Sequence, residues 1–116
     1  MPQITVDYSG LLDATFDRPA FALALHPIVV DTVDARLEAC KTRFRRVEDF
    51  TVGAETEGHA VLHVEISLLH GRTDATKARL AAAVLALVAA QVKPVDGVTL
   101  HPSVELPDLD ASYRKS

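Results

Sequence analysis

The chain has 116 residues, of which 48% are hydrophobic and 24% charged, so it is long enough for one hydrophobic core and too short for two. Its formal net charge of −4 argues against a nucleic-acid-binding surface, which needs a clustered excess of Lys and Arg. The longest apolar run, residues 80–90, is shorter than the ~20 residues that a bilayer-spanning helix needs. The single cysteine fits a reducing compartment and no export signal is visible, so we expect a cytoplasmic protein.

The first half of the chain has the pattern of a strand, a helix and a second strand. Residues 3–9 alternate between apolar and polar side chains, which predicts a strand with one buried face. A helix should follow, with Asp17 as its N-cap and Pro19 in its first turn, and Pro27 should kink it. Residues 40–47 alternate again and predict the second strand.

The second half repeats this order after a loop rich in turn formers. Residues 59–69 predict a strand with a continuous apolar face, and residues 73–92 predict a helix with Thr73 as its N-cap. Residues 98–109 predict the last strand. Because Pro102 interrupts it and lacks an N–H group, this strand belongs at a sheet edge or at a bulge.

The two strand–helix–strand units predict an α/β fold in one domain over residues 1–116, with βαβ halves at about 1–50 and 58–110. Each half should contain a parallel strand pair, and both helices should cover one face of a four-stranded sheet. The other face would then be open, and its mixture of polar and apolar side chains predicts an oligomer. Its expected members are Thr5, Asp7, Lys41, Arg43, Arg45, His59, Val61, His63, Glu65 and Leu69.

Pro2 is the first candidate for chemistry, because it follows Met1 directly and precedes the first strand. Proline is small, which favours removal of the initiator methionine, and removal would leave a free secondary amine at a strand end. Burial or a neighbouring cation lowers the pKa of an α-amino group. An amine that is neutral near pH 7 is a general base.

Cationic side chains that could hold an anionic substrate lie in two places. Arg72 lies where the third strand ends and the second helix begins, and Gly71 beside it allows close approach of a ligand. Lys41, Arg43 and Arg45 share one face of the second strand, so together these cations favour a substrate with several carboxylates. Taken alone, a run such as KTRFRR is more often an ordinary solvated strand face.

The histidines and the cysteine predict no metal site and no nucleophile. His59 and His63 share a strand face, but four residues of strand separate them by about 13 Å, too far to share one ion. Cys40 alternates into the apolar face and should fill the core, and His26 should lie on the helix surface. The chain shows no glycine-rich phosphate loop and no nucleophile elbow, so we expect no cofactor.

Three segments carry a resemblance to a known family: MPQITVDYS at the start, HAVLHVEISLLHGRT in the middle and VELPDLDASYRKS at the end. Together they resemble the 5-carboxymethyl-2-hydroxymuconate isomerase family of the tautomerase superfamily over nearly the whole length. The resemblance implies a homotrimer of duplicated βαβ units, each with a four-stranded mixed sheet. It also implies that the amino-terminal proline, here Pro2, moves a proton between carbon atoms of an unsaturated polycarboxylate keto acid.

The resemblance further implies two cations that bind substrate carboxylates. Arg72 matches the first by its HGRT context. The second falls on Lys41, with Arg43 two residues further along the same face, and a lysine keeps the charge but loses the two-pronged geometry of arginine. Either the binding geometry differs from the family's or Arg43 has taken this role.

Two alternatives stay open at the level of the sequence. The superfamily also contains phenylpyruvate tautomerases, dehalogenases and decarboxylases that start with the same proline, so the fold does not fix the substrate. A trimeric binding protein that keeps Met1 is a hypothesis from another class, because Met1 would block the amine of Pro2 as an amide.

Overall fold

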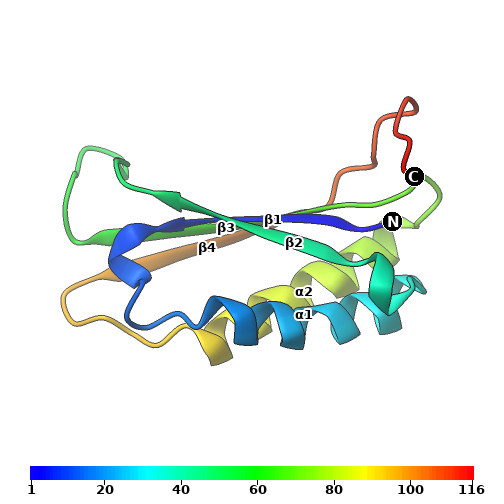
Figure 1. The fold of residues 1–116 in the computed structure, drawn as a ribbon. Coiled ribbons are helices and arrows are strands. Elements are labelled where there is room, and N and C mark those ends of the chain that lie inside the picture. The colour runs from blue at the N-terminus through cyan, green and yellow to red at the C-terminus, as the bar shows by residue number, and fades with distance from the viewer.

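The computed structural model describes residues 1–116 and consists of a four-stranded sheet with two long helices (Figure 1). The strands lie in the order β2-β1-β3-β4. The elements are β1 (Gln3–Ser9), α1 (Arg18–Val33), β2 (Lys41–Val47), β3 (His59–Ser67), α2 (Asp74–Gln91) and β4 (Thr99–Glu105), with short 3-10 turns at Gly10–Leu12 and Leu37–Ala39.

The strand pairing confirms the α/β fold with two βαβ halves. β1 pairs with β2 in parallel, β3 pairs with β4 in parallel, and the two halves meet where β1 pairs with β3 antiparallel, which makes the sheet mixed. β4 is an edge strand, as the proline at position 102 predicted. It ends at Glu105, earlier than expected, and the chain then touches the end of β3 only through an isolated bridge between Leu68 and Asp108.

Both helices cover one face of the sheet, and no helix covers the other face (Figure 1). Alternate residues of β1 and β3 point into the layer between sheet and helices, where they form a core with the buried sides of α1 and α2. Its fully buried side chains include Ile4, Val6, Phe21, Leu25, Val29, Leu62, Val64, Ile66, Leu80 and Val84. Cys40 is also buried there, although it precedes β2 instead of belonging to it.

Side-chain caps begin both helices where the sequence predicted. The carboxylate of Asp17 accepts a hydrogen bond from the Ala20 N–H at 3.1 Å, and the Thr73 hydroxyl accepts one from the Thr76 N–H at 3.1 Å. His26 differs from the expectation of a surface residue. It is half-buried and its Nε2 lies 2.7 Å from the Thr42 hydroxyl, because α1 packs under the edge strand β2.

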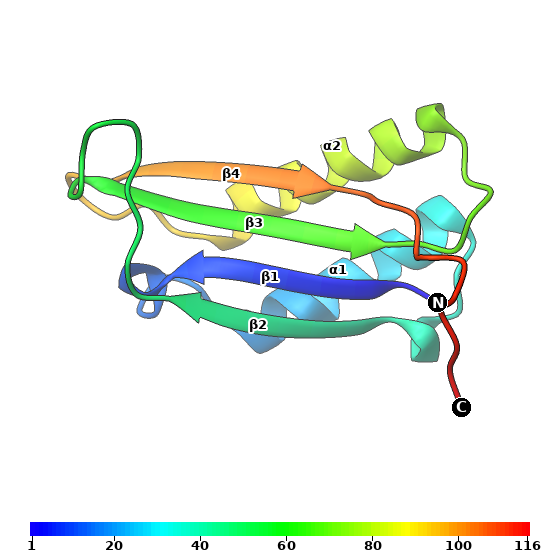
Figure 2. The ribbon, with the colours of Figure 1, turned by 90° about the horizontal axis from the view of Figure 1, so that it is seen from above.

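The strand directions bring the two termini to one end of the sheet. β1 and β2 begin at this end, and β3 and β4 finish there, so the C-terminal segment passes close to the N-terminus (Figure 2). No helix in the structure is both long and apolar enough to span a bilayer.

A pair of leucines two residues apart in α1 tests this packing. Leu25 is fully buried, whereas Leu23 is 74% exposed. We expect Leu25→Ala to lower the free energy of unfolding by about 2–5 kcal/mol, because it removes buried methyl groups and leaves a cavity. Leu23→Ala should change it by less than about 0.5 kcal/mol. Urea denaturation of both variants measures the difference, and equal effects would contradict the arrangement of α1 on the sheet.

Candidate active site

The start of β1 is held in place by its neighbour β2. Pro2 is buried, and its carbonyl oxygen accepts a hydrogen bond from the Lys41 N–H at 3.3 Å. The next residue, Gln3, is in register with Lys41 across the parallel pair. The main chain at Pro2 is therefore fixed directly beside the first residue of β2.

Three cations act on the N-terminal amino group. Burial lowers the pKa of the Met1 amino group most, followed by the positive charges of Arg72 and Lys115; Cys40 raises it, and Lys41 lowers it by a smaller amount than Cys40 raises it. Each cation comes from a different part of the chain. The structure therefore places the amino terminus in an electropositive environment that favours its neutral form.

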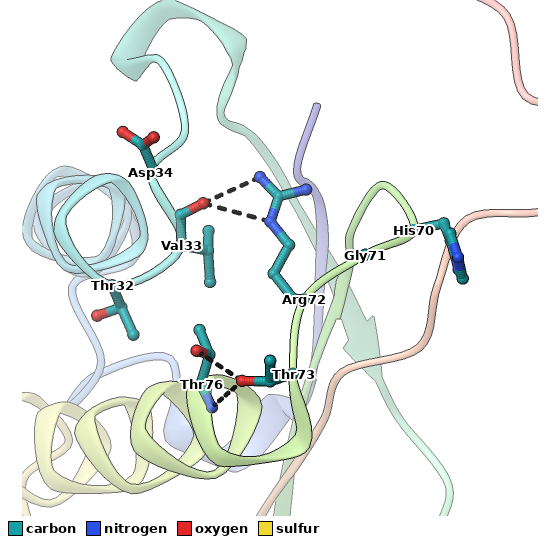
Figure 3. A pocket seen from close by; sticks show the side chains of 8 residues that line it. All are labelled: Thr32, Val33, Asp34, His70, Gly71, Arg72, Thr73 and Thr76. Atoms are coloured by element: carbon teal, nitrogen blue, oxygen red, sulfur yellow. Dashed lines mark hydrogen bonds between the residues drawn. The ribbon is translucent and has the colours of Figure 1, made fainter.

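Arg72 lies between the end of α1 and the loop that enters α2 (Figure 3). Its guanidinium donates hydrogen bonds from Nε and Nη2 to the Val33 carbonyl, at 3.3 and 2.9 Å, and from Nη1 to the Leu69 carbonyl at 3.2 Å. Val33 ends α1, so Arg72 satisfies a carbonyl at the negative end of that helix. Three of its five N–H donors are used, and one on each terminal nitrogen is left for a ligand.

A shallow polar pocket of about 480 Å³ surrounds Arg72. Gly71 allows the chain to turn into this position with a φ of 119°, a conformation that side chains with a Cβ rarely adopt. Asp34, in the left-handed conformation that ends α1, stands across the pocket (Figure 3). The remaining lining residues are Thr32, Val33, His70, Thr73 and Thr76.

The three cations of β2 have different surroundings. Arg45 forms a two-pronged ion pair with Asp7, with Nε–Oδ1 and Nη2–Oδ2 distances of 2.7 and 3.0 Å. Arg43 donates from Nη2 to the Gln3 side-chain oxygen at 2.9 Å. Lys41 donates to the carbonyl of Ala39 at 3.3 Å and is the β2 cation that acts on the amino terminus.

A second pocket, of about 300 Å³, opens beside Met1 on the side of the C-terminal segment. Its lining includes two lysines, Lys41 and Lys115, and the ring of Tyr113. Tyr113 holds this segment against β1 through its hydroxyl, which accepts a hydrogen bond from the Gln3 side-chain amide at 3.2 Å. The other lining residues are Arg36, Glu38, Ala39 and Ser116.

The outer face of β3 and β4 carries polar groups paired across the strands. His59 contacts His101 and Glu55, each at 2.9 Å, so it does not converge with His63, as the spacing along the strand indicated. His63 instead lies near Glu65 and Glu105, and the three possible ligand atoms lie within 4.8 Å of one another. This grouping depends on the register of two strands, which the spacing along one strand did not reveal.

The structure thus brings Pro2, Arg72 and Lys41 to one end of the sheet, as the candidate site requires. Arg43 is one strand repeat further along β2, beside Thr5. Sequence reasoning missed Lys115 and Tyr113, which reach the site from more than 100 residues away along the chain. No local pattern marks them, because their position depends on the path of the chain after β4.

Comparison with solved structures shows the same fold in proteins of low sequence identity. A 5-carboxymethyl-2-hydroxymuconate isomerase from Deinococcus radiodurans R1 superimposes with a TM-score of 0.81 at 19% identity, covering 98% of this chain and 88% of the other. A symmetric trimer of fused wild-type 4-OT, designated Q0, gives 0.72 at 25% identity, with 92% and 85% covered. A member of the cis-3-chloroacrylic acid dehalogenase family, N1, gives 0.64 at 18% identity, with 97% and 79% covered.

No individually curated protein matches the chain in sequence. The model of the 5-carboxymethyl-2-hydroxymuconate isomerase family, however, matches residues 2–115, almost the whole length. That match agrees with the fold, with the element order and with the likeness to the solved isomerase. The chain belongs to the 5-carboxymethyl-2-hydroxymuconate isomerase family and is an enzyme of the tautomerase type.

Proposed function

We propose that this protein is an isomerase that moves a proton between carbon atoms of an unsaturated 2-hydroxy or 2-keto polycarboxylate such as 5-carboxymethyl-2-hydroxymuconate. The general base is the nitrogen of Pro2 after Met1 has been removed. The observation that carries the proposal is the convergence of Arg72, Lys41 and Lys115 on the amino terminus, where burial and these cations lower the pKa of the Met1 amino group, one residue from the Pro2 nitrogen. The same cations complement a substrate that carries several negative charges.

In the proposed reaction of a 2-keto substrate, the neutral amine takes a proton from a carbon next to the keto group; from a 2-hydroxy substrate it takes the proton of the 2-hydroxyl group, which gives the same dienolate. The electron pair of the broken C–H bond moves into the conjugated system and places negative charge on the keto oxygen. The protonated amine then returns the proton to a more distant carbon of that system, so the product is an isomer and the enzyme is unchanged. Arg72 stabilises the negative charge and a carboxylate through its free N–H groups.

Lys41 is the better candidate than Arg43 for the second carboxylate. Lys41 is in register with Gln3 and acts on the amino group, whereas Arg43 is paired with the side chain of Gln3 and lies beside Thr5. A lysine offers a single charged point instead of a fork. The site therefore tolerates more variation in the angle of that carboxylate than an arginine would allow.

The likeness to the dehalogenase-family protein N1 favours a second candidate, another reaction that depends on the amino-terminal proline. A phenylpyruvate tautomerase and a decarboxylase belong to the same alternative, and a binding protein that keeps Met1 is the alternative without catalysis. An ultraviolet assay of ketonisation separates them, with 2-hydroxymuconates that carry or lack the carboxymethyl branch and with phenylenolpyruvate. A measurement of intact mass distinguishes the binding protein from these enzymes, since the binding protein would retain Met1.

We also propose that the protein is a homotrimer assembled through the open face of the sheet. No helix covers this face, and Val61 lies among its charged side chains, whereas Leu69, expected there from the sequence, lies beyond the end of β3. The likeness to the symmetric 4-OT trimer supports this assembly.

The first prediction concerns the free amine of Pro2. Protein produced while methionyl aminopeptidase is inhibited should be active only in proportion to the fraction that has lost Met1, because an acylated nitrogen cannot accept a proton. Pro2→Ala should keep partial activity, since it leaves a primary amine in the same place. The intact mass gives the fraction of protein without Met1. Full activity in the form that retains Met1 would contradict the role of Pro2 as the general base.

The pH profile is the control for this role. Activity should rise with pH as the amine of Pro2 loses its proton. Burial, Arg72 and Lys115 lower the pKa of the Met1 amino group, and the same surroundings should bring the inflection below about 8, the ordinary value of an α-amino group.

The second prediction separates the two tasks of Arg72. Arg72→Ala should lower kcat/KM for a dicarboxylate roughly 30- to 1000-fold, since it removes charge-assisted hydrogen bonds. It should also cost about 1–3 kcal/mol of stability, because the carbonyls of Val33 and Leu69 lose their donors. For a monoacid that lacks the contacted carboxylate, the loss of kcat/KM should be smaller.

Arg79→Ala is the matched control, because Arg79 is an exposed arginine on α2 outside both pockets near the amino terminus. Arg79→Ala should leave both kcat/KM and stability unchanged. A purely structural role for Arg72 predicts equal and small kinetic losses on the monoacid and the dicarboxylate.

The third prediction concerns assembly. Sedimentation velocity at micromolar concentration should give about three times the 12.5 kDa mass of the chain. We expect assembly because a domain of this size with so few aromatic side chains leaves a large face of its sheet exposed as a monomer. A stable monomer under these conditions would contradict the trimer.

A further inference from the structure

The segment that follows β4 is tied to the body of the protein at both of its ends. Near β3, the Leu68 N–H donates to the Pro107 carbonyl at 3.0 Å, and the Leu109 N–H donates to the Leu68 carbonyl at 2.7 Å. Lys77 of α2 holds Asp108 through an ion pair of 2.8 Å. These contacts direct the chain across the end of the sheet towards the amino terminus (Figure 2).

The second tie is to β1, through Tyr113. This half-buried residue is bonded to the Gln3 side chain, and Gln3 in turn accepts a hydrogen bond from Arg43. Tyr113 also closes a turn, in which its N–H donates to the Asp110 carbonyl at 2.9 Å. The segment is thus fixed two residues before Lys115, which limits where the ammonium group of Lys115 can reach.

The charges in the pocket beside Met1 do not balance. Its lining holds three cationic side chains, Arg36, Lys41 and Lys115, against one carboxylate side chain, Glu38, and the two chain ends at Met1 and Ser116 add one positive and one negative charge. Glu38 is paired with Arg36 at 2.6 Å. Lys41 and Lys115 have no carboxylate partner in the structure, and Lys41 uses one of its three N–H donors on the Ala39 carbonyl.

We propose that the C-terminal segment belongs to the substrate site, and that Lys115 together with Lys41 binds a carboxylate of the substrate in the pocket beside Met1, apart from the pocket that Arg72 lines. The proposal rests on the proposed function, since it names the group that the pocket would hold in a polycarboxylate. Lys115 is the binding residue, and Tyr113 is a positioning residue that acts through the path of the segment. Substrates with two or more carboxylates are thereby preferred over monoacids.

The positive charges of Lys115 and Lys41 also affect the pKa of the amino group. Lys115 is among the groups that lower the pKa of the amino group, after burial and Arg72. A carboxylate bound between Lys115 and Lys41 would partly neutralise both lysines. The amine would then hold a proton more readily with substrate bound than in the free enzyme, as a base that must accept a proton requires.

Binding of two six-carbon trans,trans-dienes tests this directly: trans,trans-muconate has a carboxylate at each end, and sorbate has only one. Titration calorimetry on the wild-type chain should show muconate binding at least about ten-fold tighter than sorbate. Lys115→Gln should remove most of this preference by weakening muconate about ten-fold, and Lys115→Arg should restore it. The affinity for sorbate should change less than two-fold.

Arg114→Gln is the matched control, because it removes a cation from the adjacent position. Arg114 donates to the carbonyls of Ala111 and Tyr113 and does not line the pocket, so its replacement should preserve the preference for muconate. Equal muconate affinity in Lys115→Gln and in the wild type would overturn the proposal, as would an equal loss in Arg114→Gln.

Catalytic assays separate a failure of this inference from a failure of the proposed isomerase. If no hydroxymuconate is turned over but Lys115→Gln still abolishes the preference for muconate, the subsite stands and the proposed reaction fails. If hydroxymuconates are turned over and Lys115→Gln leaves KM and kcat for them unchanged, the reaction stands and the subsite is wrong.

Discussion

The antiparallel pairing of β1 with β3 is the constraint on which the site depends. Gln3 at the start of β1 is in register with Ser67 at the end of β3, so the amino terminus lies where β3 turns towards α2. Because β2 runs parallel to β1 and β4 runs parallel to β3, one end of the sheet collects the starts of two strands and the ends of the other two. Pro2, Lys41, Arg72 and the C-terminal segment meet there for this reason.

Burial keeps that pairing in register. Ile4 and Ile66 face each other across β1 and β3, as do Val6 and Val64, and all four side chains are fully buried. A shift of one residue would turn these side chains to the open face and bring polar ones into the core. The position of the amino terminus relative to Arg72 is therefore fixed by apolar packing some residues away from any reacting group.

Arg72 both hydrogen-bonds to the main chain of the fold and lies in the candidate active site. Its bonds to Val33 and Leu69 orient the guanidinium before any ligand arrives. A long flexible side chain otherwise loses rotamer freedom when it binds, at a cost of about 0.5–1.5 kcal/mol. The hydrogen bonds at the end of α1 already order this side chain in the folded protein, so little rotamer freedom is left to lose on binding. Its positive charge also compensates the partial negative charge of the carbonyls at the helix terminus.

Alternation and capping in the sequence predicted all four strands, both helices and the open face, because these depend on neighbours a few residues apart. The resemblance to the isomerase family, confirmed by the family match over residues 2–115, supplied the mixed sheet and the role of Arg72 as a candidate, but not which strands pair at its centre. What the sequence did not reveal depends on pairs far apart in the chain. The contact of His26 with Thr42, the pairing of Arg45 with Asp7 and the place of Lys115 all follow from strand register or from the path after β4.

The meeting of both termini at one end of the sheet has a practical consequence for handling the protein. An affinity tag or fluorescent label attached after Ser116 would leave the fold beside the pocket that Lys115 lines, and would crowd the candidate site. Residues added ahead of Pro2 would acylate its nitrogen. The exposed turn at residues 53–58 joins β2 to β3 at the opposite end of the sheet, so a label placed there would report on the protein without touching either terminus.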